Sequence, residues 1–265
     1  MSVKSKVLAT AAALALVGGV GMAGVLGTAT AANAATPWCG ATCVDIFTHQ
    51  FGQHGSPNYV LDVSPTLDTF LPFGFIGQPV ILSRASNRDP SEDFRLEHQQ
   101  TVADFYAAGV VSAAFAQHYG CIPGVDFASC YGADITVNDP AFEIEYTPDG
   151  LPTGLCVGVA RPAVQEEGVI LQWCGSADTV WAADQFDAPL TFFTGYVPLI
   201  NGSSDTDFVQ PFVLTYPAGA YPTNEPRPQL QVDNVTGFSV GFPPGLEPGT
   251  TDDNQLWGAD FGDHF

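Results

Sequence analysis

Short apolar runs, each closed by turn-forming residues, constrain most what this chain can fold into. Most runs are four to six residues long, are rich in Val, Ile, Phe and Tyr, and are bounded by Gly, Pro, Asn or Asp. Such runs are typical of short β-strands joined by turns. Gly and Pro supply 28 and 21 of the 265 residues, without the regular glycine period of collagen. The sequence therefore predicts an all-β domain.

One order of features recurs three times along the chain. A short alternating strand is followed by a turn-rich loop, a second strand and then a polar-x-aromatic triplet. The copies run over 59–63, 77–82 and 92–94, then 155–159, 168–171 and 179–181, then 212–216, 227–232 and 255–257. One such unit buries only part of an apolar face, so three must close together to form a core. The aromatics that end the triplets, Phe94, Trp181 and Trp257, are expected to point into that core.

The segments between these copies are less uniform. Residues 101–106, 142–146 and 196–200 have the composition of further strands. Residues 107–119 fit a short helix or a strand equally well, because Gly109 interrupts the start and no clear N-cap precedes it.

The N-terminus has the pattern of a secretory signal peptide. Lys4 and Lys6 precede the uncharged, apolar stretch 7–26, and Ala32-Asn33-Ala34 forms a small-x-small cleavage signal. The sequence predicts a signal peptide over 1–34, an N-terminal segment over 35–57 and a single domain over 58–265. A retained membrane anchor is the alternative, although the high Ala and Gly content makes this stretch weakly hydrophobic. No second stretch of comparable apolar length follows, so the mature protein is expected to be exported without an integral membrane segment.

The charge balance excludes some partners. The chain has 7 basic and 28 acidic residues, and removal of the signal peptide takes away both lysines but no acid. Nucleic acids and anionic lipid surfaces are bound through Lys and Arg, so neither is expected as a partner. High solubility outside the cell or tolerance of salt accounts for the acid excess.

The six cysteines form sequence-near pairs. In an exported chain an even number of cysteines indicates disulfides. We expect the pairs Cys39–Cys43, Cys121–Cys130 and Cys156–Cys174, which is one of several arrangements that six cysteines allow. No metal site is expected, since no C-x-x-C motif occurs.

The second copy resembles one repeat of the ricin B-type lectins. It contains Cys156-Val-Gly-Val159, then Val169-Ile-Leu-Gln-Trp-Cys174 and then Thr179-Val-Trp181. Gln255-Leu-Trp257 matches the Q-x-W triplet of that family, and Glu92-Asp-Phe94 is a degenerate copy. The chain is also similar to uncharacterised secreted proteins of actinobacteria.

The resemblance covers residues 58–261 and implies a β-trefoil. The triplet aromatics are 87 and 76 residues apart, farther than in the usual repeat of this family. Long insertions are therefore expected in surface loops, at 121–140, 185–194 and 237–252. A trefoil core with an additional subdomain is the other interpretation.

The resemblance also implies where a sugar would bind. Such a site has an Asp in the first strand of a repeat, an Asn or Gln near the triplet, and an aromatic ring that stacks against the sugar. The first copy keeps Asp62 in that strand, whereas the second has Gly158 and the third has Thr215. The first copy is therefore the expected carbohydrate site, with Ser91 and Glu92 near its triplet.

Phe70, Phe73 and Phe75, in the loop after the first strand, are the candidate aromatic platforms. Alternatively, these rings pack under the loop and Asp62 makes a turn bond. A different alignment of the third copy would place a carbohydrate site at Asp233 and Asn254.

The sequence contains no H-E-x-x-H motif and no P-loop. Glu143 and Glu145 alternate along one predicted strand and could act as a glycosidase pair, but this spacing is also common on a solvated strand face. We therefore expect no catalytic residue, no metal and no cofactor.

The sequence predicts an exported, non-enzymatic binding protein whose partner is a glycan or another component of the cell envelope. The alternatives are a structural or protein-interaction module with decayed sugar sites, and a secreted hydrolase.

Overall fold

The structure, a computed structural model, describes residues 42–53, 56–57, 59–65, 74–86, 89–120, 139–160, 162–183, 196–204, 210–236, 238–239, 245–246 and 251–261. The predicted signal peptide over 1–34 lies outside them, as do Cys39, Phe70, Phe73, Cys121 and Cys130. Within the described ranges, no helix is both long enough and apolar enough to cross a membrane.

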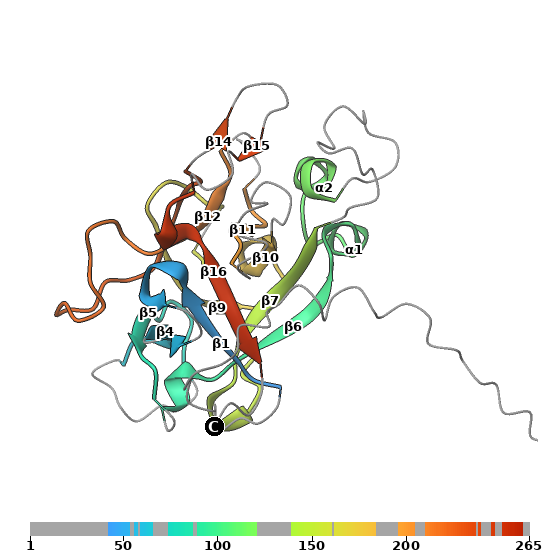
Figure 1. Cartoon of the computed structure of the whole chain (residues 1–265). Coiled ribbons are helices and arrows are strands. Elements are labelled where there is room, and N and C mark those ends of the chain that lie inside the picture. Colours follow the sequence, from blue (N-terminus) through green and yellow to red (C-terminus); the bar gives the residue numbers. More distant parts are fainter. Residues whose placement is uncertain are drawn as a thin grey trace, which may run out of the picture.

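The described chain is mostly β, with few helices and a large antiparallel sheet, so the all-β prediction is confirmed (Figure 1). The strands are β1 (Val44–Thr48), β2 (Gly52–Gln53), β3 (Ser56–Pro57), β4 (Tyr59–Val63), β5 (Val80–Arg84), β6 (Phe94–Thr101), β7 (Pro140–Tyr146), β8 (Leu155–Val159), β9 (Glu167–Trp173), β10 (Val180–Ala183), β11 (Leu199–Asn201), β12 (Phe212–Thr215), β13 (Gln231–Asn234), β14 (Phe238–Ser239), β15 (Gly245–Leu246) and β16 (Trp257–Phe261). The α-helices are α1 (Val102–Ala107) and α2 (Ala113–Tyr119), and the short 3-10 helices are η1 (His49–Phe51), η2 (Pro90–Glu92), η4 (Pro148–Gly150), η5 (Ala177–Thr179) and η6 (Asp253–Gln255).

Six of these strands pair in a closed ring. β6 pairs with β1 and β7, β10 pairs with β7 and β11, and β16 pairs with β1, beside which it runs in Figure 1. The ring closes where Val197, just before β11, bridges to Trp257 at the start of β16. Closure leaves none of the six as an edge strand, and edge strands are what expose unpaired backbone groups. β1 lies in the segment 35–57 that the sequence placed before the domain, so this segment contributes to the same sheet.

Three hairpins alternate with the ring strands along the chain. They are β4–β5, β8–β9 and β12–β13, and they contact one another through the β9–β13 pairing and through isolated bridges. Where they meet, the Leu230 amide donates to the Val80 carbonyl and the Val169 amide donates to the Leu230 carbonyl, both at 2.8 Å. All three side chains are fully buried. The hairpins therefore pack together around one shared point.

The strand pairing of the triplet aromatic follows the same pattern in three modules of the chain. The first module comprises β1, β4, β5 and β6, the second β7 to β10, and the third β11, β12, β13 and β16. In each, the aromatic that ends the triplet pairs with the first ring strand of its own module and with that of the next. The partners are Val44 and Tyr146 for Phe94, Phe142 and Asn201 for Trp181, and Val197 and Thr48 for Trp257. On every first ring strand the two partners are therefore four residues apart.

The two tryptophans make equivalent hydrogen bonds. The Trp181 indole Nε1 donates to the carbonyl of Val157 at 2.9 Å, and the Trp257 indole Nε1 donates to the carbonyl of Leu214 at 2.7 Å. Val157 and Leu214 occupy matching positions, because each lies in the first strand of the hairpin of its module. Both indoles are buried and hydrogen-bonded, so each indole links a strand of the closed ring to the hairpin of the same module.

The helices correct one sequence prediction and decide between two alternatives that the sequence left open. Residues 102–106, predicted as a strand, form α1, and half of the ambiguous segment 107–119 forms α2. Thr101 and Asp104 make a capping box that pairs the free amides at the start of α1. Ser112 caps α2 by accepting from the Phe115 amide at 3.1 Å. Gly109 has a φ of +75° in the turn between the helices, a conformation that glycine adopts without strain.

Candidate functional site

The structure brings together three of the predicted site residues. Asp62 lies on β4, while Ser91 and Glu92 lie in η2 just before β6. The Ser91 hydroxyl donates to Asp89 Oδ1 at 2.5 Å, and Ser91 lies close enough to Asp62 to lower its pKa. The charge of Asp62 in turn acts on Glu92. β4 and η2 are in direct contact. The site predicted for the first copy is therefore one place in the fold.

Asp62 is, however, held by the fold rather than open to a ligand. Only 1% of it is exposed. Its Oδ2 lies 3.4 Å from Nη1 of Arg227, and the same nitrogen donates to the Ser83 hydroxyl at 2.7 Å. Burial raises the pKa of Asp62 to about 6, against the lowering effects of Ser91, Ser83 and Arg227. Arg227 comes from the loop before β13, so this contact joins the first and third modules.

Asp62 belongs to a cluster of four buried carboxyl groups. This carboxyl cluster consists of Asp45, Asp62, Glu92 and Asp93, each at most 7% exposed. Burial is the largest cause of each pKa shift, raising the pKa of Glu92 to about 9 and those of Asp45 and Asp93 to about 7. Negative neighbours add to the effect, because like charges disfavour ionisation. The cluster therefore holds protons that the same groups would release in water.

The aromatic platform predicted in the loop is only partly described. Phe75 is 41% exposed, so its ring is not packed under the loop. Its amide donates to Gln78 Oε1 at 3.1 Å, which shapes the turn before β5. The adjacent Ile76 is also exposed.

The alternative pair in the third copy is used for loop contacts. Asp233 accepts from Gln165 Nε2 at 2.8 Å and from Gln231 Nε2 at 2.6 Å. Asn254 donates from Nδ2 to the Tyr216 carbonyl at 2.7 Å. In the part of the chain that the structure describes, no hydrogen bond joins Asp233 to Asn254.

A second polar centre forms on β7 around Glu143, which the sequence analysis considered only as one of a pair of acids with Glu145. Its Oε1 accepts from the Gly175 amide and the Thr179 hydroxyl, both at 2.6 Å, and its Oε2 lies 2.8 Å from His98 Nδ1. Glu143 is 1% exposed, whereas the His98 side chain is 64% exposed. The buried carboxylate therefore orients an imidazole that faces solvent.

The backbone at His98 is unusual. Its φ is +49°, and the β6–β7 register shifts between Glu97 and Gln100. A non-glycine residue rarely adopts this left-handed conformation, and β-bulges redirect side chains. The bulge thus turns the imidazole towards Glu143.

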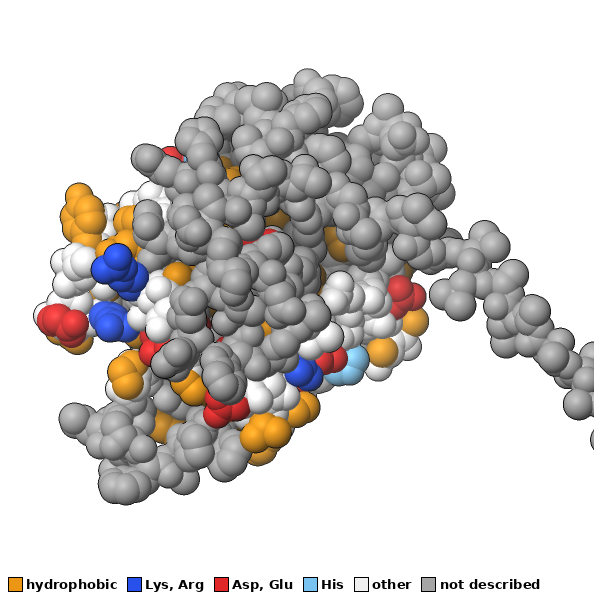
Figure 2. Space-filling model, turned by 60° about the horizontal axis from the view of Figure 1, so that its bottom comes forward, with side chains coloured by type: hydrophobic (Ala, Val, Ile, Leu, Met, Phe, Trp, Pro, Cys, Tyr) orange, Lys and Arg blue, Asp and Glu red, His pale blue; other side chains and the backbone are white. Residues whose placement is uncertain are grey.

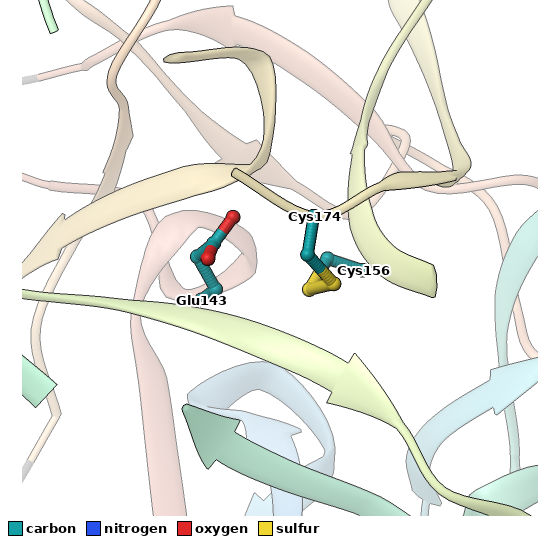
Figure 3. Close-up of side chains that lie close together, drawn as sticks. All are labelled: Glu143, Cys156 and Cys174. Atoms are coloured by element: carbon teal, nitrogen blue, oxygen red, sulfur yellow. A yellow bond between two sulfur atoms is a disulfide. The ribbon is translucent and has the colours of Figure 1, made fainter. Parts of the chain in front are cut away.

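The disulfide Cys156–Cys174 lies beside Glu143, and Figure 3 shows the carboxylate next to the two sulfur atoms. This pairing confirms one of the three that the sequence predicted. Because the sulfurs are bonded to each other, this group does not form a metal site. Cys43 is also disulfide-bonded, to a partner outside the described ranges.

An exposed tryptophan lies beside Gly154, whose backbone amide is bound by Glu145. Trp173 at the end of β9 is 62% exposed, and its ring lies 3.8 Å from where a Cβ on Gly154 would stand. The Gly154 amide donates to Glu145 Oε1 at 2.7 Å. Glu143 and Glu145 point to the same face of β7, so His98 and Trp173 are anchored at neighbouring points of that face. We call His98, Glu143, Glu145 and Trp173 the β7 surface.

The sequence contained a signal for Trp173 that the motif analysis did not use. It directly precedes Cys174, which closes the β8–β9 hairpin through its disulfide to Cys156. Elsewhere, exposed hydrophobic side chains stand singly or in small groups beside charged ones, as the described part of the face in Figure 2 shows.

Comparison of the chain with protein-family models finds no match, and comparison with curated proteins finds none.

Proposed function

We propose that the chain is a β-trefoil of the ricin B-like kind and that it acts as an exported, non-enzymatic carbohydrate-binding protein. The closed ring of six strands, the three hairpins and the threefold register support the trefoil. The matching indole bonds of Trp181 and Trp257 support it independently.

The exposed Trp173 ring is the observation that carries the carbohydrate proposal. A flat exposed ring suits the C–H face of a sugar, and polar groups beside it suit the hydroxyls. His98 supplies such a group, because Glu143 holds its Nδ1 and leaves Nε2 towards solvent. In this proposal the sugar binds at the β7 surface, since Asp62 is buried.

Substitution of Trp173 tests the proposal. A glycan array identifies the ligand, and Trp173→Ala is then expected to weaken binding of that glycan at least tenfold in affinity electrophoresis. Tyr221→Ala is the matched control, because Tyr221 is another aromatic residue with 62% exposure. The control should bind as the wild type does. An array without binding, or equal binding by Trp173→Ala, would contradict the proposal.

Two alternatives remain distinct from it. A structural or protein-interaction module is favoured by the burial of Asp62, whose carboxylate the fold itself uses. That module would bind no glycan, and a cross-linker placed at residue 173 would capture one defined protein. A hydrolase using Glu143 or Glu145 would lose turnover in Glu143→Gln or Glu145→Gln. We expect no turnover, because Glu143 is buried and both its oxygens accept hydrogen bonds.

A further inference from the structure

Glu92 has a register-matched counterpart in Gln255 of the third module. Each lies two residues before the triplet aromatic, at the end of a 3-10 helix, and each is at most 5% exposed. Gln255 Oε1 accepts from the Thr236 amide at 2.7 Å, and Glu92 Oε2 accepts from the Ser86 amide at 2.8 Å. Ser86 and Thr236 both lie two positions beyond the second hairpin strand. One oxygen therefore makes the same bond in both modules.

The other terminal atom differs in chemistry. Gln255 Nε2 donates to the Thr215 hydroxyl at 3.2 Å and to the Asn234 carbonyl at 3.0 Å. In the first module, Asp62 occupies the register position of Thr215, and Glu92 Oε1 occupies that of the amide nitrogen. A carboxylate cannot donate at this place, whereas a carboxylic acid can.

Two buried oxygens lack partners at this place. Among the described residues, Glu92 Oε1 and Asp62 Oδ1 make no hydrogen bond. Two ionised carboxylates buried side by side would repel, and each would lack part of its solvation. One proton placed between the two groups removes both costs.

We propose that Glu92 is a neutral carboxylic acid that donates a hydrogen bond from Oε1 towards Asp62. Loss of this proton to solvent at alkaline pH destabilises the first module. The proton links η2 to β4. Asp62 in turn is tied to β5 and the third module through Arg227 and Ser83. Deprotonation therefore weakens two sets of contacts at once, namely that between η2 and β4 and that between β4 and the third module.

The surrounding charges favour the protonated form. Burial is the largest cause of the raised pKa of Glu92, which lies at about 9, and nearby carboxylates add to it. Arg227 is the opposing positive charge, and it acts on Asp62. The ionisable groups around this site are Asp62 on β4, Asp45 on β1, Asp89 and Asp93 on either side of η2, Asp149 in η4, Tyr146 on β7, Asp260 on β16, Arg95 on β6 and Arg227 before β13.

The sign of the pH effect follows from linkage. Between the unfolded pKa of 4.5 and the folded pKa of about 9, the folded protein keeps a proton that the unfolded chain releases. The unfolding constant therefore rises with pH over this window, by up to about tenfold per unit, and levels off above it. Glu92→Gln supplies a permanent donor and removes this dependence.

The test compares chemical denaturation of the wild type and Glu92→Gln from pH 5 to pH 10. The ratio of their unfolding constants is expected to grow with pH and to level off near pH 9. Glu97→Gln, at a half-buried glutamate on β6, is the matched control and should show a pH-independent ratio to the wild type. Parallel profiles for the wild type and Glu92→Gln would overturn the proposal.

A second measurement follows this proton in the wild type itself. NMR of the wild type labelled with ¹³C at glutamate carboxyls should show one glutamic acid, absent from Glu92→Gln spectra, that is still protonated at pH 7.5. A Glu92 carboxyl that titrates below pH 6 would overturn the proposal. In Asp62→Asn the Glu92 titration should move to lower pH, and an unchanged titration would exclude Asp62 as the partner.

Discussion

At the residue scale, the contact with Arg227 makes Asp62 a structural residue rather than a ligand-binding one. Asp62 is buried and Arg227 reaches it across 165 residues of sequence. A buried carboxylate without a partner is costly. The ion pair explains why a strand acid that suits a sugar is here part of the fold.

Removal of the arginine should expose this dependence. We expect Arg227→Met to lower the free energy of unfolding by about 1–3 kcal/mol at pH 8. The loss should be smaller at pH 5, because Asp62, with a pKa of about 6, is then largely protonated and no longer needs the positive charge. Urea denaturation at both pH values measures the two losses. Equal losses would contradict a role in charge pairing.

The two buried indoles allow a matched pair of substitutions. Trp181→Phe and Trp257→Phe each remove one hydrogen bond to a hairpin carbonyl, at 2.9 and 2.7 Å. Each should cost about 1–3 kcal/mol through the unpaired carbonyl and the lost volume. The two costs should agree within about 1 kcal/mol if the positions are equivalent. Calorimetric unfolding of both variants provides the comparison, and a large cost at only one site would argue against equivalence.

At the scale of elements, the capping box of α1 explains a segment that strand composition misrepresented. Residues 102–106 are apolar and short, so their composition resembles a strand, but the Thr101–Asp104 cap makes the helical start favourable. Side chains of α1 and α2 bury against β10, β11 and β12. A spacing of three between a Thr and an Asp was the available signal.

Removal of this cap should destabilise α1 locally. Thr101→Ala is expected to cost about 1 kcal/mol, because the Asp104 amide loses its acceptor. Hydrogen exchange should become faster at the amides of 104–108, with little change in β8 and β9. Unchanged exchange in α1 would show that packing alone holds this helix.

The sequence predicted the elements better than the site, for a physical reason. Alternating strands, triplets and the Cys156–Cys174 pair depend on neighbours in the chain, so local pattern suffices. The burial of Asp62 depends on Arg227, and the exposure of Trp173 depends on where its hairpin ends. Such contacts join distant segments, and one sequence does not reveal them.

At the scale of the whole molecule, the carboxyl cluster makes stability depend on pH. The raised pKa values of Asp45, Glu92 and Asp93, at about 7 to 9, mean that folding takes up protons at neutral pH. Stability should therefore be higher near pH 5 than near pH 8.5. Thermal unfolding at the two pH values measures this difference. A midpoint that rises with pH would contradict the account.

The closed ring of strands is the central claim, and Trp257 is where it can be tested most directly. In the ring, Trp257 pairs with Thr48 on one side and exchanges backbone hydrogen bonds with Val197 on the other, at 2.9 and 3.0 Å. NMR measurement of interstrand NOEs and through-hydrogen-bond couplings at Trp257 should detect both neighbours in one species. Contacts to Thr48 without contacts to Val197 would mean an open sheet, and the threefold arrangement would then be wrong.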